Sequence, residues 1–246
     1  MSKIAVIGGT GLTSLNGLNI TSREVVQTPY GEPSGPLTHG EFHGHEIAFF
    51  ARHGYGHNIP PHKVNYRANI WAMKHIGIEA VIAVAAVGGI LPETTPGQII
   101  IPHQIIDYTH GRGHTFFEDD LHKVMHIDFT DPYCGDLRNT LISAAQQTGI
   151  DFLDHGTYGA TQGPRLETAA EIDRLERDGC TLVGMTGMPE TALARELGLC
   201  YATCAVVANF AAGRGEGEIT MNQIEANLCS GMDKVRLLLE HTIPLL

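Results

Sequence analysis

Side chains that could bind an anion follow several short apolar segments of this sequence. Thr10 lies in a glycine-rich run at 8–11. Arg52 follows a second apolar run, and Thr186 comes shortly after the apolar segment 181–183. The ligands of α/β proteins gather at the carboxyl ends of such strands, where hydroxyls, a guanidinium and backbone amides together suit an oxyanion. The pattern favours inorganic phosphate over a nucleoside triphosphate, because it has no Walker lysine or magnesium-binding cluster.

Residues 162–190 combine an acid and a strand end in a way that suits a purine nucleoside. Glu167 follows a turn at 163–165 and precedes a helical apolar face, so its carboxylate is expected at the entrance of a helix. Met185 and Thr186 fall just beyond the strand predicted at 181–183. This order of loop, helix and strand can hold a purine at one end and an anion at the other.

Alternating strand and helix patterns predict the elements that position these residues. Apolar runs predict strands at 3–7, 46–51, 80–87, 98–106, 181–183 and 199–208, and helical periodicity predicts helices at 64–76, 136–148, 169–175 and 220–239. Residues 108–133 are predicted to form a long loop that is functional or makes subunit contacts, and 213–217 to form a flexible loop. The alternation predicts an α/β fold, a three-layer sandwich that forms a single domain over residues 1–246.

Composition and charge exclude several classes of function. The chain has 246 residues, 43% of them hydrophobic, and a net charge of -11, which disfavours binding to nucleic acid. No segment predicts a membrane span or a secretory signal, so a cytoplasmic location is expected. The 14 histidines lack the spacing of metal ligands, so no metal site is predicted. Five cysteines without paired CxxC spacing are expected to be reduced thiols, with neither a disulfide framework nor a zinc site: Cys134, Cys180, Cys200, Cys204 and Cys229.

The glycine run at 8–11 is open to three interpretations. It suits a phosphate loop, it begins many dinucleotide-binding domains, and it is equally consistent with a structural turn. An NAD-dependent oxidoreductase would need a third glycine where this chain has Ser14, and an acid at the end of the second strand, where it has Arg52 and His53. A non-catalytic nucleoside-binding protein is a further alternative, although a complete phosphate site would then have no evident purpose.

Seven segments together resemble one family over nearly the whole chain. They are GGTGL (8–12), ARHG (51–54), KVNYRANIWAMK (63–74), AVGGIL (86–91), PGQIIIPHQIID (96–107), QGPRLET (162–168) and GMTGMPE (184–190). In this order the set resembles the methylthioadenosine phosphorylase and purine nucleoside phosphorylase family. The resemblance implies a central mixed sheet flanked by helices and a homotrimer with sites near subunit interfaces. It also implies phosphorolysis of a purine nucleoside, with inorganic phosphate as co-substrate and without a metal or an organic cofactor.

The resemblance also implies roles for individual residues. The implied phosphate contacts are Thr10, Arg52, His53, the main chain of Ala85 and Ala86, and Thr186. The implied substrate contacts are Leu166, Glu167, Met185, Asn209, Phe210, Ala211, Met221, Ile224 and His122, the last expected to reach the sugar pocket of a neighbouring subunit. Asn209, acting on N7 of the purine, and Thr186 are the implied catalytic residues.

Three of these residues are expected to select the substrate. The Glu167 carboxylate can accept from N1–H of a 6-oxopurine but would face a lone pair at N1 of adenine. The Asn209 amide can donate to a 6-oxo group and accept from a protonated N7. Met221, one turn before Ile224, offers a thioether an apolar wall, although the two also fit an ordinary helix-packing stripe. The predicted substrate is S-methyl-5′-thioinosine, with methylthioadenosine, inosine or guanosine as alternatives.

Overall fold

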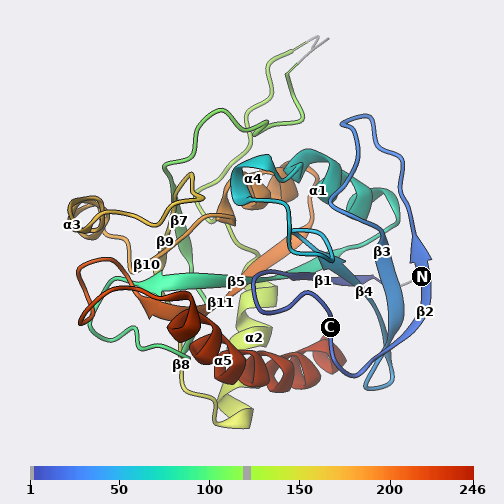
Figure 1. The fold of residues 1–246 in the computed structure, drawn as a ribbon. Coiled ribbons are helices and arrows are strands. Elements are labelled where there is room, and N and C mark those ends of the chain that lie inside the picture. The colour runs from blue at the N-terminus through green and yellow to red at the C-terminus, as the bar shows by residue number, and fades with distance from the viewer. Residues whose placement is uncertain (1–2, 119–122) are drawn as a thin grey trace.

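The computed structural model describes residues 3–118 and 123–246, and within them strands and helices form three layers (Figure 1). The strands are β1 (Ile4–Gly8), β2 (Leu18–Glu24), β3 (Leu37–Phe42), β4 (His45–Ala51), β5 (Ala80–Gly89), β6 (Ile99–Ile100), β7 (Gln104–Asp107), β8 (Phe152–Leu153), β9 (Thr157–Ala160), β10 (Leu182–Gly184) and β11 (Cys200–Phe210). The helices are α1 (Tyr66–His75), α2 (Gly135–Thr148), α3 (Ala169–Arg177), α4 (Gly187–Glu196) and α5 (Met221–Thr242), with the 3-10 turns η1 (Pro61–Lys63) and η2 (Ile243–Leu245). The predicted α/β sandwich with a mixed central sheet is confirmed.

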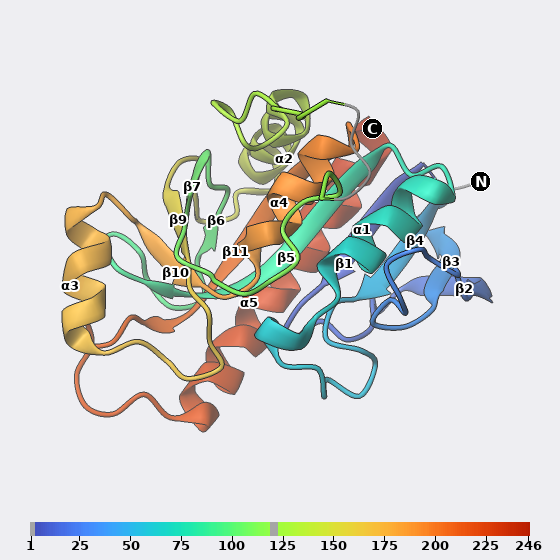
Figure 2. The ribbon, with the colours of Figure 1, turned by 90° about the horizontal axis from the view of Figure 1, so that it is seen from above.

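The central sheet runs in the order β2-β3-β4-β1-β5-β10-β9-β7, and β11 pairs with β5 and β6. Strand β1 is parallel to both β4 and β5, and β11 is parallel to β5 over its whole length. Helices α2 and α5 cover one face of the sheet, while α1 and α4 cover the other (Figure 1). Seen from above, α1 and α4 lie side by side along the strands (Figure 2).

Alternate residues of the inner strands supply the cores on the two faces. Val6 and Ile82 pack in the cluster that contains the apolar residues of α2 and α5. Their neighbours Ala5 and Val81 pack in the cluster that contains those of α1 and α4. Residues 80–89 are therefore apolar without interruption, as expected for a strand that is buried on both faces. In the described part of the chain, no helix is long and apolar enough to cross a membrane.

One edge of β5 is open between two strands that pair with it. Strand β1 pairs with β5 as far as Ala83, and β10 pairs only with Gly88 and Gly89. Among the described residues, no strand pairs with residues 84–87 on this edge. The main chain of that segment is therefore available to a ligand, while the opposite edge of β5 is held by β11 along its full length.

Thr186 reaches this gap by a different route from the one predicted from the sequence. The sequence suggested that the strand ends meet because the sheet is parallel, but β10 is antiparallel to β5. Because β10 runs back along the end of β5, the residues after Gly184 lie beside the open segment 84–87. The approach is close, since a Cβ on Gly184 would overlap the Tyr158 hydroxyl and lie 3.1 Å from the Val87 side chain.

Several elements differ from the sequence-based expectation. The strand predicted at 98–106 is divided into β6 and β7 around Pro102, which has no N–H to donate to a ladder. The hairpin β2–β3, the short strands β8 and β9 and the helix α4 were not predicted. Strands β8 and β9 are too short to give a periodic signal, and α4 contains Gly187 and Pro189, which are poor helix formers.

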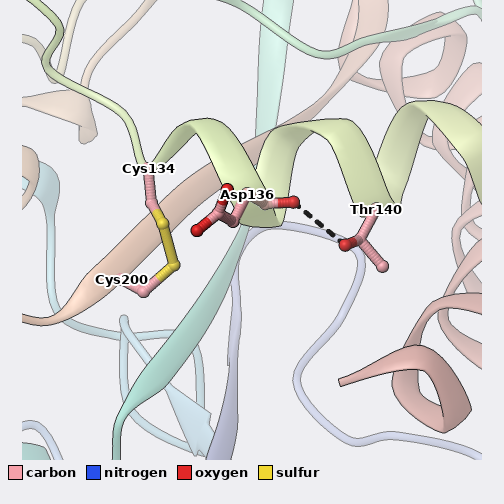
Figure 3. Close-up of a disulfide and its surroundings, with 4 residues drawn as sticks. All are labelled: Cys134, Asp136, Thr140 and Cys200. Atoms are coloured by element: carbon pink, nitrogen blue, oxygen red, sulfur yellow. Dashed lines mark hydrogen bonds between the residues drawn. A yellow bond between two sulfur atoms is a disulfide. The ribbon is translucent and has the colours of Figure 1, made fainter.

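The expectation of reduced cysteines is wrong for one pair. Cys134 and Cys200 form a disulfide, with their Cα atoms 5.1 Å apart (Figure 3). Cys134 is the N-cap residue of α2, and its backbone N–H donates to the Tyr201 carbonyl at 2.8 Å, which brings the start of α2 against the start of β11. The pair is separated by 66 residues, so sequence spacing carried no signal of it. Cys180, Cys204 and Cys229 are free.

Candidate active site

A cavity of about 540 Å³ lies at the carboxyl ends of β1, β4, β5, β10 and β11. Its volume falls in the range of small-molecule sites, roughly 300–1,000 Å³. The residues that were predicted to bind phosphate or substrate and that line this cavity are Thr10, Arg52, His53, Ala85, Ala86, Leu166, Glu167, Met185, Thr186, Asn209, Ala211, Met221 and Ile224. Phe210 lines an adjoining cavity instead. His122 lies outside the described residues.

Arg52 lies at one end of the cavity, beneath the glycine-rich loop that follows β1. A Cβ on Gly9 would be 2.7 Å from the Val84 carbonyl oxygen and 3.0 Å from Nη1 of Arg52. Only a glycine therefore lets the loop approach both groups. The Arg52 side chain is only 1% exposed, so its charge acts from within the protein rather than from the surface.

A buried carboxylate fixes the orientation of the Arg52 guanidinium. Nε and Nη2 of Arg52 donate to the two carboxylate oxygens of Glu190 at 2.6 and 2.7 Å, and Nη1 donates to the Val84 carbonyl at 2.9 Å. The Tyr201 hydroxyl donates to the same carboxylate at 2.7 Å. Since a guanidinium has five N–H groups, two remain for a ligand. Burial alone would lower the pKa of Arg52, but the Glu190 charge and hydrogen bonds raise it above its usual value.

His53 offers the same end of the cavity a neutral acceptor. Its Nδ1 lies 2.8 Å from the Ile59 carbonyl oxygen, which can only accept, so Nδ1 carries the proton. Burial, and next the charge of Arg52, lower the pKa of His53 to about 4. At neutral pH the ring is therefore uncharged, and its Nε2 presents a lone pair. Such a nitrogen suits the P–OH group of hydrogen phosphate rather than a bare phosphate oxygen.

His57 is a lining residue that the sequence did not indicate. Its Nε2 lies 3.5 Å from the Thr10 hydroxyl, and its ring centroid lies 4.9 Å from that of His53. Burial lowers the pKa of His57 as well. Two histidines, one hydroxyl and one buried guanidinium thus line the same cavity.

Glu167 lies at the other end of the cavity, directly before α3. Thr168 is the N-cap of this helix, and its hydroxyl and the Glu171 side chain form a reciprocal capping box with the backbone. The Thr161 hydroxyl donates to Oε1 of Glu167 at 2.6 Å. Among the described residues, no other group donates to this carboxylate, so Oε2 is left to accept from a ligand.

A β-bulge sets the orientation of Asn209. The pairing of β11 with β5 shifts register between Val207 and Asn209, and such bulges turn a side chain to a new direction. Nδ2 of Asn209 donates to the Phe210 carbonyl oxygen at 2.6 Å. Among the described residues, no group donates to the amide oxygen of Asn209, so this oxygen is available as an acceptor.

The start of α5 forms an apolar part of the cavity wall. Thr220 caps the helix through a capping box with Gln223, and the first helical residue is Met221. Ile224 is buried, whereas Met221 is 61% exposed at the mouth of the cavity. Ile219 contributes to the same wall.

The supporting residues of the site carried weaker sequence signals than the lining ones. Glu190 belongs to the segment GMTGMPE but was assigned no role, because its partner Arg52 lies 138 residues away in the chain. Tyr201 lies in β11 and Thr161 directly follows β9, and the sequence assigned no role to either residue. Their contribution depends on hydrogen bonds to Glu190 and Glu167 that only the folded chain brings about.

Comparison with known proteins places this geometry in a family. Residues 3–244 match the family model described as the phosphorylase superfamily. A probable S-methyl-5′-thioinosine phosphorylase of Pseudomonas syringae pv. tomato is 56% identical over 243 residues, which cover 99% of each chain. A 6-oxopurine nucleoside phosphorylase of Pyrococcus furiosus is 45% identical over 100% of this chain and 94% of its own.

A solved structure agrees over the full length. The methylthioadenosine phosphorylase of Schistosoma mansoni, in complex with adenine, superposes with a TM-score of 0.95 at 31% identity and covers 100% of this chain and 92% of its own. Sequence, fold and the arrangement of the cavity therefore agree: the chain belongs to the phosphorylase superfamily.

Proposed function

We propose that this protein cleaves S-methyl-5′-thioinosine with inorganic phosphate, giving hypoxanthine and 5-methylthioribose 1-phosphate. The observation that carries the proposal is the single cavity, which joins an anion end at Arg52 to a base end at Glu167 and Asn209. The relative from Pseudomonas syringae, 56% identical and named a probable S-methyl-5′-thioinosine phosphorylase, supports the same substrate.

Phosphate is proposed to bind at the Arg52 end of the cavity. The two unused N–H groups of Arg52, the Thr10 and Thr186 hydroxyls and the amides of the open β5 segment would hold three oxygens. His53 would accept from the remaining P–OH group. Because the Arg52–Glu190 pair has no net charge, binding relies on directed N–H and O–H groups more than on an excess of positive charge.

The reaction is proposed to proceed by displacement at the anomeric carbon. The bond from C1′ to N9 breaks, its electron pair goes to the purine, and a phosphate oxygen forms the new bond to C1′. The anion beneath the sugar stabilises the cationic, oxocarbenium-like transition state. Overall, one proton moves from hydrogen phosphate to the purine, and the Asn209 amide oxygen accepts a hydrogen bond from the protonated N7. Positioning of the two substrates thus replaces a nucleophilic side chain.

Glu167 and Met221 are proposed to select the nucleoside. The free Oε2 of Glu167 accepts from N1–H of hypoxanthine, whereas N1 of adenine has no proton to donate. The wall formed by Met221, Ile224 and Ile219 presents no hydrogen-bonding side chain to the 5′ position, which suits a methylthio group better than a hydroxyl. Both features together favour methylthioinosine over methylthioadenosine and inosine.

Steady-state kinetics with three nucleosides test this proposal. We expect kcat/KM for methylthioinosine to exceed those for methylthioadenosine and inosine by at least about tenfold, since an unmatched buried polar contact discriminates strongly. No purine should be released without phosphate. Faster cleavage of methylthioadenosine, or release of hypoxanthine in phosphate-free buffer, would contradict the proposal.

A broader 6-oxopurine nucleoside phosphorylase is the second candidate. The relative from Pyrococcus furiosus, which is named for that activity, favours it. Equal kcat/KM values for inosine and methylthioinosine would support this candidate, because they would show that the apolar wall at Met221 does not select the 5′ group.

We further propose that the chain assembles as a homotrimer. The segment between β7 and α2 exposes the apolar side chains of Val124 and Met125, which are 66% and 51% exposed in the single chain. Exposed apolar groups clustered in one segment are typical of a subunit contact. Light scattering coupled to size-exclusion chromatography should give a mass of three chains, and a monomer would contradict this assembly.

A further inference from the structure

Arg112 lies in the long segment between β7 and α2, yet its side chain is turned into the protein beside the cavity. The residue is only 9% exposed. Nη1 donates to the carbonyl oxygens of Met185 at 2.9 Å and Met188 at 2.6 Å. Nη2 donates to the carbonyl oxygens of Thr161 at 3.3 Å and Gln162 at 2.9 Å. One guanidinium therefore links two segments that lie far apart in the sequence.

The two linked segments follow the neighbouring strands β9 and β10, where the Thr161 backbone N–H donates to the Gly184 carbonyl at 2.8 Å. Thr161, whose hydroxyl holds Glu167, belongs to the segment on the base side. Met185 and Thr186 line the proposed ribose and phosphate part of the cavity, and Met188 follows them in α4. Beyond the end of the β9–β10 pair, the two segments are thus also linked by a side chain that does not itself line the cavity.

Further contacts with Gln162 and Tyr66 hold the side chain of Arg112 in place. Its Nε donates to the Gln162 side-chain oxygen at 3.2 Å, and the His110 backbone N–H donates to the same oxygen at 3.1 Å. The guanidinium also lies over the Tyr66 ring, 5.4 Å from its centroid. The Arg112 side chain is therefore held by Gln162, which the His110 backbone also contacts, and by the Tyr66 ring.

The charge of Arg112 is balanced by dipoles alone. Among the described residues, its hydrogen-bond partners are backbone carbonyls, one amide oxygen and the Tyr66 hydroxyl, with no carboxylate. Burying a cation in this way is costly unless its donors are satisfied. The planar guanidinium of an arginine carries five N–H donors on three nitrogens and can reach carbonyls on two segments at once. The ammonium group of a lysine carries its donors on one nitrogen.

We propose that Arg112 is a positioning residue that holds the base-side segment after β9 and the ribose-side segment after β10 fixed relative to each other beyond the end of the strand pair. This inference rests on the proposed function, because it assigns the two segments to the two parts of the nucleoside. Without the link, the β9–β10 pairing would still join the two strands, but Glu167 and Met185, which lie beyond it, would be free to shift relative to each other. Both the rate and the discrimination between 6-oxo and 6-amino purines would then decline.

Arg112→Met and Arg112→Lys test the inference. The first variant removes all the donors while keeping an unbranched side chain, and the second keeps the charge but loses the planar fork. We expect Arg112→Met to lower kcat/KM for methylthioinosine by at least about tenfold, since small misplacements are that costly in preorganised sites. The preference for methylthioinosine over methylthioadenosine should fall as well. Arg112→Lys should show both losses in part.

Arg138→Met is the matched control. Arg138 also donates to three backbone carbonyls, those of Pro102 at 2.9 Å, Ile101 at 3.3 Å and Asp154 at 2.6 Å, but none of these residues lines the cavity. This variant should lower the unfolding temperature without changing the substrate preference. If Arg112→Met and Arg138→Met alter the preference equally, or if neither Arg112 variant alters it, the inference is overturned.

Direct binding measurements separate this inference from the proposed function. Calorimetric titration of wild type and Arg112→Lys with hypoxanthine requires no turnover. Weaker hypoxanthine binding in the variant, by about tenfold, supports the role of Arg112 even if methylthioinosine is not the best substrate. Unchanged hypoxanthine binding contradicts the role of Arg112 and leaves the proposed reaction intact.

Discussion

At the scale of single residues, the site depends on which hydrogen-bonding atoms are left unused. Arg52 uses three N–H groups on Glu190 and Val84, which leaves two for a ligand in the cavity that it lines. Asn209 uses Nδ2 on a neighbouring carbonyl and keeps its oxygen free. Each of these polar atoms thus either holds a neighbouring group in place or is left to bind the ligand. A site that is preorganised in this way needs no rearrangement during the reaction.

Replacing Asn209 tests the proposed choice of base. In Asn209→Asp the second N–H of Nδ2, which the Phe210 carbonyl does not use, can no longer donate to a 6-oxo group, so the preference for methylthioinosine over methylthioadenosine should fall by about tenfold. The ratio of the two kcat/KM values measures this change. Asn227→Asp is the control, because Asn227 lines the adjoining cavity and not the active-site cavity. An unaltered ratio in Asn209→Asp would leave Glu167 as the selecting residue.

His53 should make folding stability depend on pH below neutrality. Its pKa is lowered to about 4 in the folded chain, so the unfolded chain binds the proton more tightly. Stability is therefore unaffected by His53 above about pH 6.5 and falls as the pH drops from there towards 4, by about 3 kcal/mol in all. Urea unfolding from pH 4 to 8 should show that the free energy of unfolding falls less at acid pH in His53→Gln than in wild type. Parallel losses in the two proteins would show that another group is responsible.

At the scale of elements, the site exists because β5 is longer than β1 and β10, the two strands that pair with its other edge. Strand β1 stops at the Ala83 position, β10 begins pairing only at Gly88, and the cavity opens between them. Helix α3 then begins directly after Glu167, so the entrance of one helix determines where the base-side carboxylate lies.

Removing the cap of α3 should affect both stability and nucleoside binding. Thr168→Ala loses the capping box and should lower the free energy of unfolding by about 1 kcal/mol. The KM for the nucleoside should rise because Glu167 precedes the cap, while the KM for phosphate should not change. Thr140→Ala in α2, which removes a hydroxyl that donates to the Asp136 carbonyl at 2.9 Å (Figure 3), is the control and should change stability by less than about 0.5 kcal/mol. Equal effects of the two variants on the nucleoside KM would contradict this role of the cap.

At the scale of the whole molecule, the disulfide and the base-side residue Asn209 lie at opposite ends of β11. The disulfide holds Cys200 at the start of this strand, and Asn209 lies near its end. Nine residues of extended strand separate the two positions by about 30 Å. The covalent link is therefore expected to act on folding rather than on the reaction.

Reduction of the disulfide should destabilise the protein without impairing the enzyme. The bridge closes a loop of 66 residues, for which the chain-entropy model gives about 4 kcal/mol of stabilisation. Thermal unfolding of Cys134→Ser should show a lower midpoint than that of wild type, while kcat and both KM values at 25 °C stay unchanged. Cys229→Ser, at an exposed free thiol, is the control. Equal midpoints for wild type and Cys134→Ser would show that the bridge contributes nothing to stability.

Local sequence patterns were enough to predict the fold class and the residues that follow the strand ends. An apolar run followed by Thr10, Arg52 or Thr186 is a local pattern, and local patterns predict a strand and the loop after it. The motifs in their order also indicated the family. The weakest elements, such as β8 and β9, escaped prediction because two to four residues are too few to show a period.

The atoms that support those residues are brought to them only when the chain folds. Glu190 pairs with Arg52, which lies 138 positions away in the chain, and Cys200 pairs with Cys134, 66 positions away. Arg112 belongs to a third segment and joins two others. Each of these pairings depends on how distant segments pack against one another, and no spacing within the chain encodes it. The antiparallel return of β10 is of the same kind, because strand direction is set by the path of the chain between strands and not by the strand residues themselves.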